Sequence, residues 1–291
     1  MRFLLLGGTG QVGRELRSLG QPGVDIVAPS RAELDLQDPR SIAKILATEP
    51  WNVVINAAAY TDVDGAESNE AVAFAVNAVG PSQLAAEAGR HGIPLIHIST
   101  DYVFDGRKGA PYFENDATAP LNTYGRSKLA GERGICGATL RHVILRTSWV
   151  YSPFGKNFVR TILRLAAERE CLSIVADQHG CPTAACDIAR ACLDIALRCA
   201  SEPETAPYGL YHFAGVGEAT WFEFACAIVE MAEAQLPRTP LVVPIQTIDY
   251  PMVAHRPADT RLDCSAVTRA FGISPRPWRE ALKGTCDHLL T

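Results

Sequence analysis

The chain begins with a short apolar run that ends at a glycine-rich loop. Of all features of the sequence, this one most narrows the possible folds. Arg2 to Leu6 is typical of a strand, and Gly7, Gly10 and Gly13 follow before an apparent helix. In such a loop the first glycine permits a tight turn, the second lets amides approach a pyrophosphate, and the third lets the helix pack on the sheet. The helix N-terminus adds partial positive charge. The sequence therefore predicts a dinucleotide on Gly7, Gly10, Gln11, Val12 and Gly13.

Short apolar runs go on alternating with helical patterns through the first half of the chain, which is typical of βαβ units. The predicted strands are residues 2–6, 25–28, 52–55, 95–98 and 143–146. This pattern predicts an α/β fold with a Rossmann-like doubly wound parallel sheet and a smaller C-terminal substrate-binding lobe. We expect residues 1–150 to form the dinucleotide-binding domain, with segments near 173–215 returning to it, and residues 151–291 to form mainly the lobe.

Helical patterns cover residues 69–91, 157–170, 187–199 and 221–233. Gly80-Pro81 should break or kink the first of these, because proline removes a helical donor. Asp38 can cap a helix that starts at Pro39. Residues 251–261, rich in proline and charge, are expected to form an ordered loop.

Composition excludes several classes of protein. The 291 residues are 47% hydrophobic and 20% charged, and the net charge of -5 offers no basic field for nucleic acid. The first apolar run is too short for a signal peptide or a membrane span, so we expect a cytoplasmic protein without a membrane partner. Nine scattered cysteines without a metal-binding spacing are expected to be reduced core thiols.

The residues after the second predicted strand bear on the choice of cofactor. NAD-binding folds place a carboxylate there for the ribose 2′-hydroxyl, whereas this chain has Ser30-Arg31. A hydroxyl beside a guanidinium suits a 2′-phosphate, which favours NADPH and leaves NADH as the alternative. Asp35 and Leu36 complete the expected contacts at this end of the cofactor.

Tyr124 and Lys128 stand four residues apart, and therefore on one face of a predicted helix. A nearby ammonium lowers the pKa of a phenol, so we expect Lys128 to assist proton transfer by Tyr124. Thr100 follows a parallel strand, at the edge where α/β sheets bind ligands. Together these three side chains would polarise a ketone and protonate it as hydride arrives on carbon.

The motifs together resemble the dTDP-4-dehydrorhamnose reductases, a family of extended short-chain dehydrogenases/reductases, over nearly the whole chain. Besides the glycine loop, the similar segments are 56–61, 63–67, 99–106, 120–125, 146–151, 157–158, 177–178, 182–183 and 256–257. The resemblance implies NADPH-dependent reduction of dTDP-4-dehydro-6-deoxy-L-mannose at C4, which gives dTDP-L-rhamnose for cell-surface polysaccharides.

The resemblance also implies roles for individual residues. Thr100, Tyr124 and Lys128 would be catalytic, and Tyr124 and Lys128 would also contact the cofactor. Further cofactor contacts would come from Ala57, Ala58, Ala59 and Tyr60. The implied substrate-binding residues are Thr100, Asp101, Tyr102, Trp149, Asn157 and Arg256. Trp149 either flanks the sugar or belongs to the core, and Arg256 either binds the substrate diphosphate or forms a surface ion pair.

Some members of the family bridge a homodimer with Mg²⁺ held by glutamates. Glu15 stands where one ligand would be expected, but the other two places are Cys186 and His288. Hard Mg²⁺ prefers oxygen ligands, so we expect no metal, while a homodimer is retained as an expectation.

Two other functions fit parts of the same pattern. Another nucleotide-sugar reductase, epimerase or dehydratase could use this fold, but dehydratases usually carry Thr-Asp-Glu, and here Tyr102 follows Asp101. A non-catalytic, nucleotide-binding regulatory subunit is the second alternative. Such a subunit has no need of a proton donor, and this chain has the residues of one.

Overall fold

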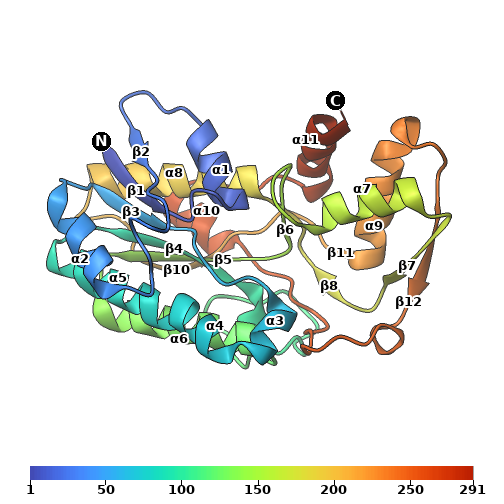
Figure 1. Ribbon diagram of the computed structural model, residues 1–291, viewed down its shortest axis with the longest axis horizontal. Coiled ribbons are helices and arrows are strands. Elements are labelled where there is room, and N and C mark those ends of the chain that lie inside the picture. The colour runs from blue at the N-terminus through green and yellow to red at the C-terminus, as the bar shows by residue number, and fades with distance from the viewer. Residues whose placement is uncertain (291) are drawn as a thin grey trace.

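A six-stranded parallel sheet forms the larger lobe of the computed structural model, which describes residues 1–290 (Figure 1). Its strand order is β10-β5-β4-β3-β1-β2, and every neighbouring pair is parallel. The strands are β1 (Arg2–Leu6), β2 (Asp25–Val27), β3 (Val53–Asn56), β4 (Leu95–Thr100), β5 (His142–Thr147) and β10 (Gly209–His212). The predicted α/β fold with a doubly wound parallel sheet is confirmed.

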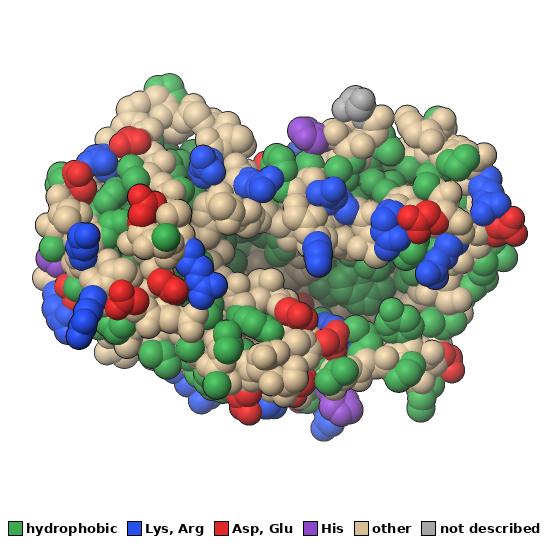
Figure 2. Space-filling model, viewed as in Figure 1, with side chains coloured by type: hydrophobic (Ala, Val, Ile, Leu, Met, Phe, Trp, Pro, Cys, Tyr) green, Lys and Arg blue, Asp and Glu red, His purple; other side chains and the backbone are tan. Residues whose placement is uncertain are grey.

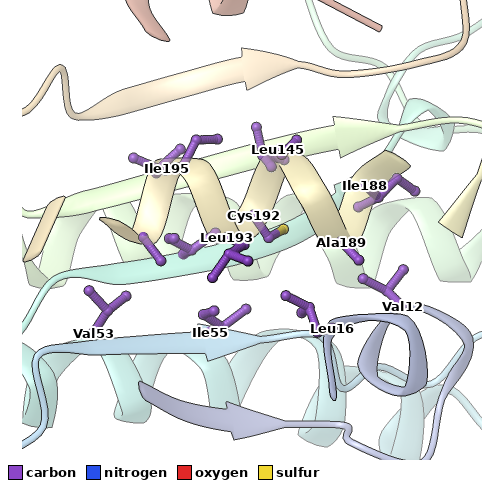
Figure 3. Close-up of a cluster of buried hydrophobic side chains, with 14 of the residues drawn as sticks. Val12, Leu16, Val53, Ile55, Leu145, Ile188, Ala189, Cys192, Leu193 and Ile195 are labelled. Atoms are coloured by element: carbon purple, nitrogen blue, oxygen red, sulfur yellow. The ribbon is translucent and has the colours of Figure 1, made fainter. Parts of the chain in front are cut away.

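Helices cover both faces of this sheet, which explains why its strands are nearly continuous apolar runs. The helices of one face are α1 (Gln11–Ser18), α8 (Ala185–Ser201) and α10 (Ser265–Phe271). The other face carries α2 (Pro39–Thr48), α5 (Gly80–Arg90) and α6 (Thr123–Ala138). Figure 3 shows Leu16 and Cys192 among the side chains that pack between α1, α8 and the strands.

The predicted helix over residues 69–91 is not broken at Gly80-Pro81. Instead α4 (Glu70–Phe74) continues through a π-helical turn, η1 (Ala75–Val79), into α5. Pro81 then lies in the first turn of α5, where its missing N–H costs little. A π-turn is a common site of function in a helix. A shorter helix, α3 (Val63–Ser68), precedes this run.

The smaller lobe is built from helices and three short strand pairs around its own core. The pairs are β6 (Val150–Tyr151) with β9 (Thr183–Ala184), β7 (Cys171–Val175) with β12 (Leu241–Ile245), and β8 (His179–Gly180) with β11 (Ala219–Thr220). The helices are α7 (Phe158–Glu168), α9 (Trp221–Ala232) and α11 (Trp278–Leu290). Single 3-10 turns are η2 (Asp101–Val103), η3 (Glu233–Gln235) and η4 (Thr247–Asp249). Figure 2 shows the surface hollowed between the two lobes.

Residues 185–212 carry the chain back to the larger lobe, because α8 packs on α1 and β10 pairs with β5. All nine cysteines are free thiols, but Cys136 and Cys171 are exposed, so not all of them belong to the core as predicted. Among residues 1–290, no helix is both long and apolar enough to cross a membrane.

Candidate active site

The candidate site lies where the strand order of the larger sheet reverses. After β1 the chain moves outward to β2 and then returns to the other side of β1 as β3. The carboxyl ends of parallel strands share one edge, so the residues after β1, β3, β4 and β5 meet there. Such a switch point is the place where open α/β sheets bind ligands.

The glycine loop after β1 is shaped to bring backbone close to backbone. Gly7 has φ +82°, and a Cβ there would lie 2.6 Å from the carbonyl carbon of Ala57. A Cβ on Gly13 would lie 2.1 Å from the Gly7 oxygen. Gly13 is therefore needed for packing of α1 against the loop itself, rather than against the sheet as predicted. The N-terminus of α1 has no side-chain cap, so its amides suit a pyrophosphate.

Gln11 and Val12, two further residues of the predicted cofactor loop, have different surroundings. Val12 is buried in the core, which leaves only its backbone for a cofactor. Gln11 Oε1 accepts a hydrogen bond from Asn157 Nδ2 at 3.0 Å. Asn157 also caps α7 by accepting from the Arg160 amide. The structure places the Asn157 side chain against the predicted cofactor loop, and its expected contact with substrate stays a prediction.

Beyond β2, carboxylates accept hydrogen bonds from Ser30 and Arg31, the two residues predicted to bind the 2′-phosphate. Both the amide and the hydroxyl of Ser30 donate to Glu33 Oε2, at 2.8 and 2.7 Å. Arg31 Nε donates to Asp35 Oδ2 at 3.2 Å. Leu36, also predicted to contact the cofactor, has its side chain in the core. Glu33 was missed by the sequence analysis, although Ser-x-x-Glu is a known capping pattern that could have drawn attention to it.

The segment after β3 is held by a buried side chain that sequence reasoning also missed. Asn77, in the π-helical turn, accepts from the Tyr60 amide at 2.8 Å and donates to the Tyr60 carbonyl at 3.0 Å. Its Nδ2 also donates to the Ser127 hydroxyl of α6. Asn77 thus fixes the position of the 57–60 segment relative to the helix that carries Tyr124 and Lys128.

Lys128 is buried and points into the strand end of β4. Its Nζ donates to the Ile98 carbonyl at 2.7 Å and lies 3.1 Å from His97 Nε2. The fully buried His97 in turn contacts Asn56 Nδ2 through Nδ1, and Asn56 Oδ1 accepts from the Ala58 amide. Burial lowers the pKa of Lys128 to about 8. A buried polar chain therefore links the lysine to the segment predicted to line the cofactor.

Tyr124 behaves differently from the prediction that Lys128 would lower its pKa. Burial raises the pKa of the Tyr124 phenol, and a hydrogen bond with Thr100 offsets this only in part. Desolvation disfavours the phenolate, while the ammonium is directed to Ile98 and His97 instead. The phenol is consequently protonated at neutral pH, which is the state that a proton donor requires.

Thr100 ends β4 beside these groups, and its hydroxyl donates to Asp101 Oδ1 at 2.9 Å. Asp101 is buried and also accepts from the Ser148 hydroxyl. Burial raises the pKa of Asp101 to about 6. The carboxyl therefore lies beneath the site and orients Thr100. Its predicted contact with substrate stays a prediction.

Tyr102 and Arg256 meet across the site. Arg256 donates to Asp64 Oδ2 at 2.7 Å and to the Tyr102 hydroxyl at 3.2 Å, while the Tyr102 ring lies edge-on to Tyr124. Arg256 therefore forms an ion pair, the alternative that the sequence analysis left open, and it ties the loop of residues 251–261 to α3. This loop is ordered by such contacts, since Ala254 also donates to Asp64.

Trp149 belongs to the packing of the smaller lobe. Its ring stacks on Trp221 with centroids 3.5 Å apart, and a Cβ on Gly180 would lie 2.4 Å from the Trp149 ring. Trp149 also has φ +45°, a rare backbone conformation for a bulky residue. Trp149 is partly buried against the core of the smaller lobe, so it is not the fully buried core residue of the alternative, and its sugar contact stays a prediction.

The residues of the considered magnesium site lie near one another on α1, α8 and α11. Burial raises the pKa of Glu15. Of its neighbours, His288 lowers this pKa and Asp187 raises it. Among residues 1–290, no group of three or more His, Cys, Asp or Glu side chains is arranged to hold a metal ion.

A doubly wound sheet, an uncapped helix after a glycine loop, and a Thr/Tyr/Lys group at the switch point define a short-chain dehydrogenase/reductase of the extended type. The model of a family described as "RmlD substrate binding domain" matches residues 1–291. A dTDP-4-dehydrorhamnose reductase of Sinorhizobium fredii is 43% identical over 97% of this chain and 96% of its own. One of Aggregatibacter actinomycetemcomitans is 44% identical over 97% of both chains. The chain belongs to the dTDP-4-dehydrorhamnose reductase family.

Solved structures agree with this assignment. The crystal structure of a dTDP-4-dehydrorhamnose reductase from Clostridium acetobutylicum matches with a TM-score of 0.91 and 34% identity over all of both chains. Another from Bacillus anthracis, determined in complex with NADP, also gives 0.91 and 34% over 99% of both chains. A UDP-glucose 4-epimerase of Thermotoga maritima, at 19% identity over 99% of this chain and 98% of its own, shares the fold with a TM-score of 0.80.

Proposed function

We propose that this protein reduces the C4 ketone of dTDP-4-dehydro-6-deoxy-L-mannose with NADPH, which gives dTDP-L-rhamnose. The observation that carries the proposal is the Tyr124 phenol, hydrogen-bonded to Thr100 and one helical turn before the buried Lys128, at the sheet edge that also carries the glycine loop. The family supports the substrate, and the complex of the Bacillus anthracis relative with NADP supports the cofactor.

The residues of this chain fit a dinucleotide. The uncapped N-terminus of α1 and the close backbone approach at Gly7 suit the pyrophosphate, and the 57–60 segment and Lys128 suit the nicotinamide end. When bound, the nicotinamide supplies a hydride to the carbonyl carbon. The protein contributes positioning and the proton.

Tyr124 and Thr100 act on the carbonyl oxygen. The Tyr124 hydroxyl donates to this oxygen and transfers its proton as negative charge develops, which leaves a phenolate on Tyr124 and an alcohol on the sugar. Thr100 stabilises the same oxygen when its hydroxyl hydrogen turns to it from Asp101 Oδ1, its acceptor in the unliganded structure. The Lys128 ammonium, which donates to the Ile98 carbonyl in the unliganded structure, turns toward the phenolate one helical turn away once it forms, and stabilises it until a proton returns from solvent.

Dehydration is a weaker fit at this site. The position where dehydratases carry a glutamate is occupied by Tyr102, whose hydroxyl accepts a hydrogen bond from Arg256. A phenol with a pKa raised by burial does not take a proton from a sugar carbon at neutral pH. Reduction needs no such base.

The direct test is to supply NADPH with dTDP-4-dehydrorhamnose and to identify the product by mass spectrometry and NMR. We expect oxidation of one NADPH for each dTDP-L-rhamnose formed. Consumption of NADPH with a different nucleotide sugar, and not with this one, would overturn the substrate and keep the class of reductase.

Tyr124→Phe separates an enzyme from a binding subunit. We expect kcat to fall by about 10²- to 10⁴-fold with the Kd for NADPH unchanged, because only the proton donor is lost. Tyr208→Phe is a matched control, since Tyr208 donates to the Pro203 carbonyl far from the site. Full turnover by the Tyr124 variant would contradict the proposed mechanism.

We further propose that the enzyme works in the cytoplasm as a homodimer without a bridging Mg²⁺. The pairing of Glu15 with Cys186 and His288 supports the absence of the ion, because thiol and imidazole are poor ligands for it. Sedimentation with and without EDTA tests the dimer and the absence of a bridging ion. A dimer that dissociates on chelation would contradict the proposal.

A further inference from the structure

Ser30 and Arg31 were expected to bind the 2′-phosphate of NADPH, yet both face carboxylates. Glu33 Oε2 accepts from the Ser30 amide at 2.8 Å and from its hydroxyl at 2.7 Å. Asp35 Oδ2 accepts from Arg31 Nε at 3.2 Å. Two carboxylates and one guanidinium thus surround the place, beyond the end of β2, where the adenosine ribose of a dinucleotide lies in this fold.

We propose that Glu33 determines the choice between NADPH and NADH, because it competes with the 2′-phosphate for the two donors of Ser30. The inference rests on the proposed function and adds to it a residue that sets cofactor selectivity. With NADH, Glu33 keeps Ser30 and is free to accept from the ribose 2′-hydroxyl. With NADPH, the phosphate takes the Ser30 donors and the Glu33 carboxylate turns away.

The charges and the exposure of these groups support the competition. The hydrogen bonds from Ser30 lower the pKa of Glu33, and those from Gln37 and Arg31 lower the pKa of Asp35 against a smaller effect of burial, so both are ionised at neutral pH. A 2′-phosphate adds about -1.5 to -2 more charge. Ser30, Arg31 and Glu33 are exposed, so Glu33 can move without disturbing the core.

Glu33 also has a structural role, which the test must separate from its effect on cofactor choice. The amides of Glu33 and Leu34 donate to the Ser30 carbonyl at 3.0 Å and close a turn, which the Glu33 carboxylate supports by accepting from the Ser30 amide. Glu33→Gln keeps an acceptor for Ser30 and removes only the charge. Glu168→Gln is the matched control, because Glu168 is an exposed glutamate on α7 in the other lobe.

The experiment measures Kd for NADPH and for NADH by quenching of tryptophan fluorescence, at low and high salt. For Glu33→Gln we expect the ratio Kd(NADH)/Kd(NADPH) to rise roughly fivefold to tenfold, and less at high salt. Ser30→Ala should lower the ratio, and Glu168→Gln should not change it. Thermal unfolding checks that each variant is folded.

The outcomes for this inference and for the proposed function are distinct. An unchanged or lower ratio for Glu33→Gln, or equal gains for both cofactors, would overturn the role of Glu33 and leave the reductase intact. Failure of the unsubstituted protein to bind either dinucleotide would overturn the proposed function itself.

Discussion

Lys128 is the residue in which burial and function conflict most clearly. An ammonium with almost no exposure donates to the Ile98 carbonyl and lies beside the His97 ring, without an opposite charge in hydrogen-bond contact. Desolvation makes this costly for the charged form. The fold tolerates the cost because the same position brings Nζ to the strand end where Tyr124 lies.

The pH dependence of turnover should report this lysine. Because its pKa is lowered to about 8, the ammonium is lost above this pH and the phenolate of Tyr124 is no longer stabilised. We expect kcat to decline on an alkaline limb near pH 8, measured with saturating NADPH and ketone. In Lys128→Met, kcat should be low at all pH values and this limb should be absent. A limb that persists in the variant would assign it to another group.

The contribution of Lys128 to the stability of the protein should rise with pH, whereas turnover falls. The unfolded chain keeps the Lys128 proton up to about pH 10.4, while the folded protein loses it near 8, so the unfolded state binds more protons between these values. Stability contributed by this site is therefore low below pH 8 and rises up to about pH 10. Lys128→Met should raise the free energy of unfolding at pH 7 by on the order of 1–3 kcal/mol. Urea denaturation of both forms at pH 7 and pH 10 measures it.

At the scale of elements, the start of α6 determines where Tyr124 lies. Asn122 caps the helix by accepting from the Gly125 amide at 2.8 Å, and its Nδ2 donates to the His255 carbonyl at 2.8 Å. The Glu67 carboxylate accepts from both the amide and the hydroxyl of Thr123. The proton donor follows directly after this anchored turn.

Asn122→Ala should therefore affect catalysis as well as stability. We expect a loss of about 2 kcal/mol in unfolding free energy from the cap and the unpaired His255 carbonyl. We also expect kcat to fall roughly 10- to 100-fold, because Tyr124 loses its fixed position. Asp38→Ala removes the cap of α2, far from the site, and should lower stability without changing kcat. Equal kcat values in both variants would contradict the positioning role.

The sequence predicted the helices and strands better than the side-chain contacts between them. The five strands of the first half follow from apolar runs, and the glycine loop, Tyr124 and Lys128 follow from short spacings. Asn77 joins Tyr60 to Ser127, which are 17 and 50 residues away from it, and no local pattern marks such a meeting. The π-helical turn that places Asn77 was likewise not predicted, because Gly80-Pro81 indicates a break or kink and does not distinguish either from a π-turn.

At the scale of the whole molecule, the loop of residues 251–261 joins the two lobes across the site. Asp64 on α3 accepts from the Ala254 amide and from Arg256, residues that are 190 and 192 positions away. The Asn122 contact with His255 adds a third tie. The loop therefore completes the site from the far end of the chain.

Asp64→Asn should loosen this loop while keeping a similar side chain. We expect KM for the nucleotide sugar to rise by about tenfold with kcat nearly unchanged, since the loop carries Arg256, a predicted substrate contact, and not the proton donor. Asp116→Asn, which weakens the surface pair with Lys108, is the control. A fall in KM would instead show that Asp64 withholds Arg256 from the substrate diphosphate.

Neither lobe is a continuous piece of chain, and this affects how the protein can be cut or built. A fragment ending near residue 150 would lack α8, β10 and α10, which leaves the edge of β5 unpaired and one apolar face of the sheet covered by α1 alone. Such a fragment should aggregate rather than serve as an isolated cofactor-binding domain. During synthesis the larger lobe must likewise wait for β10 near residue 212 and for α10 near residue 271, so a ribosome-bound chain needs protection over that interval.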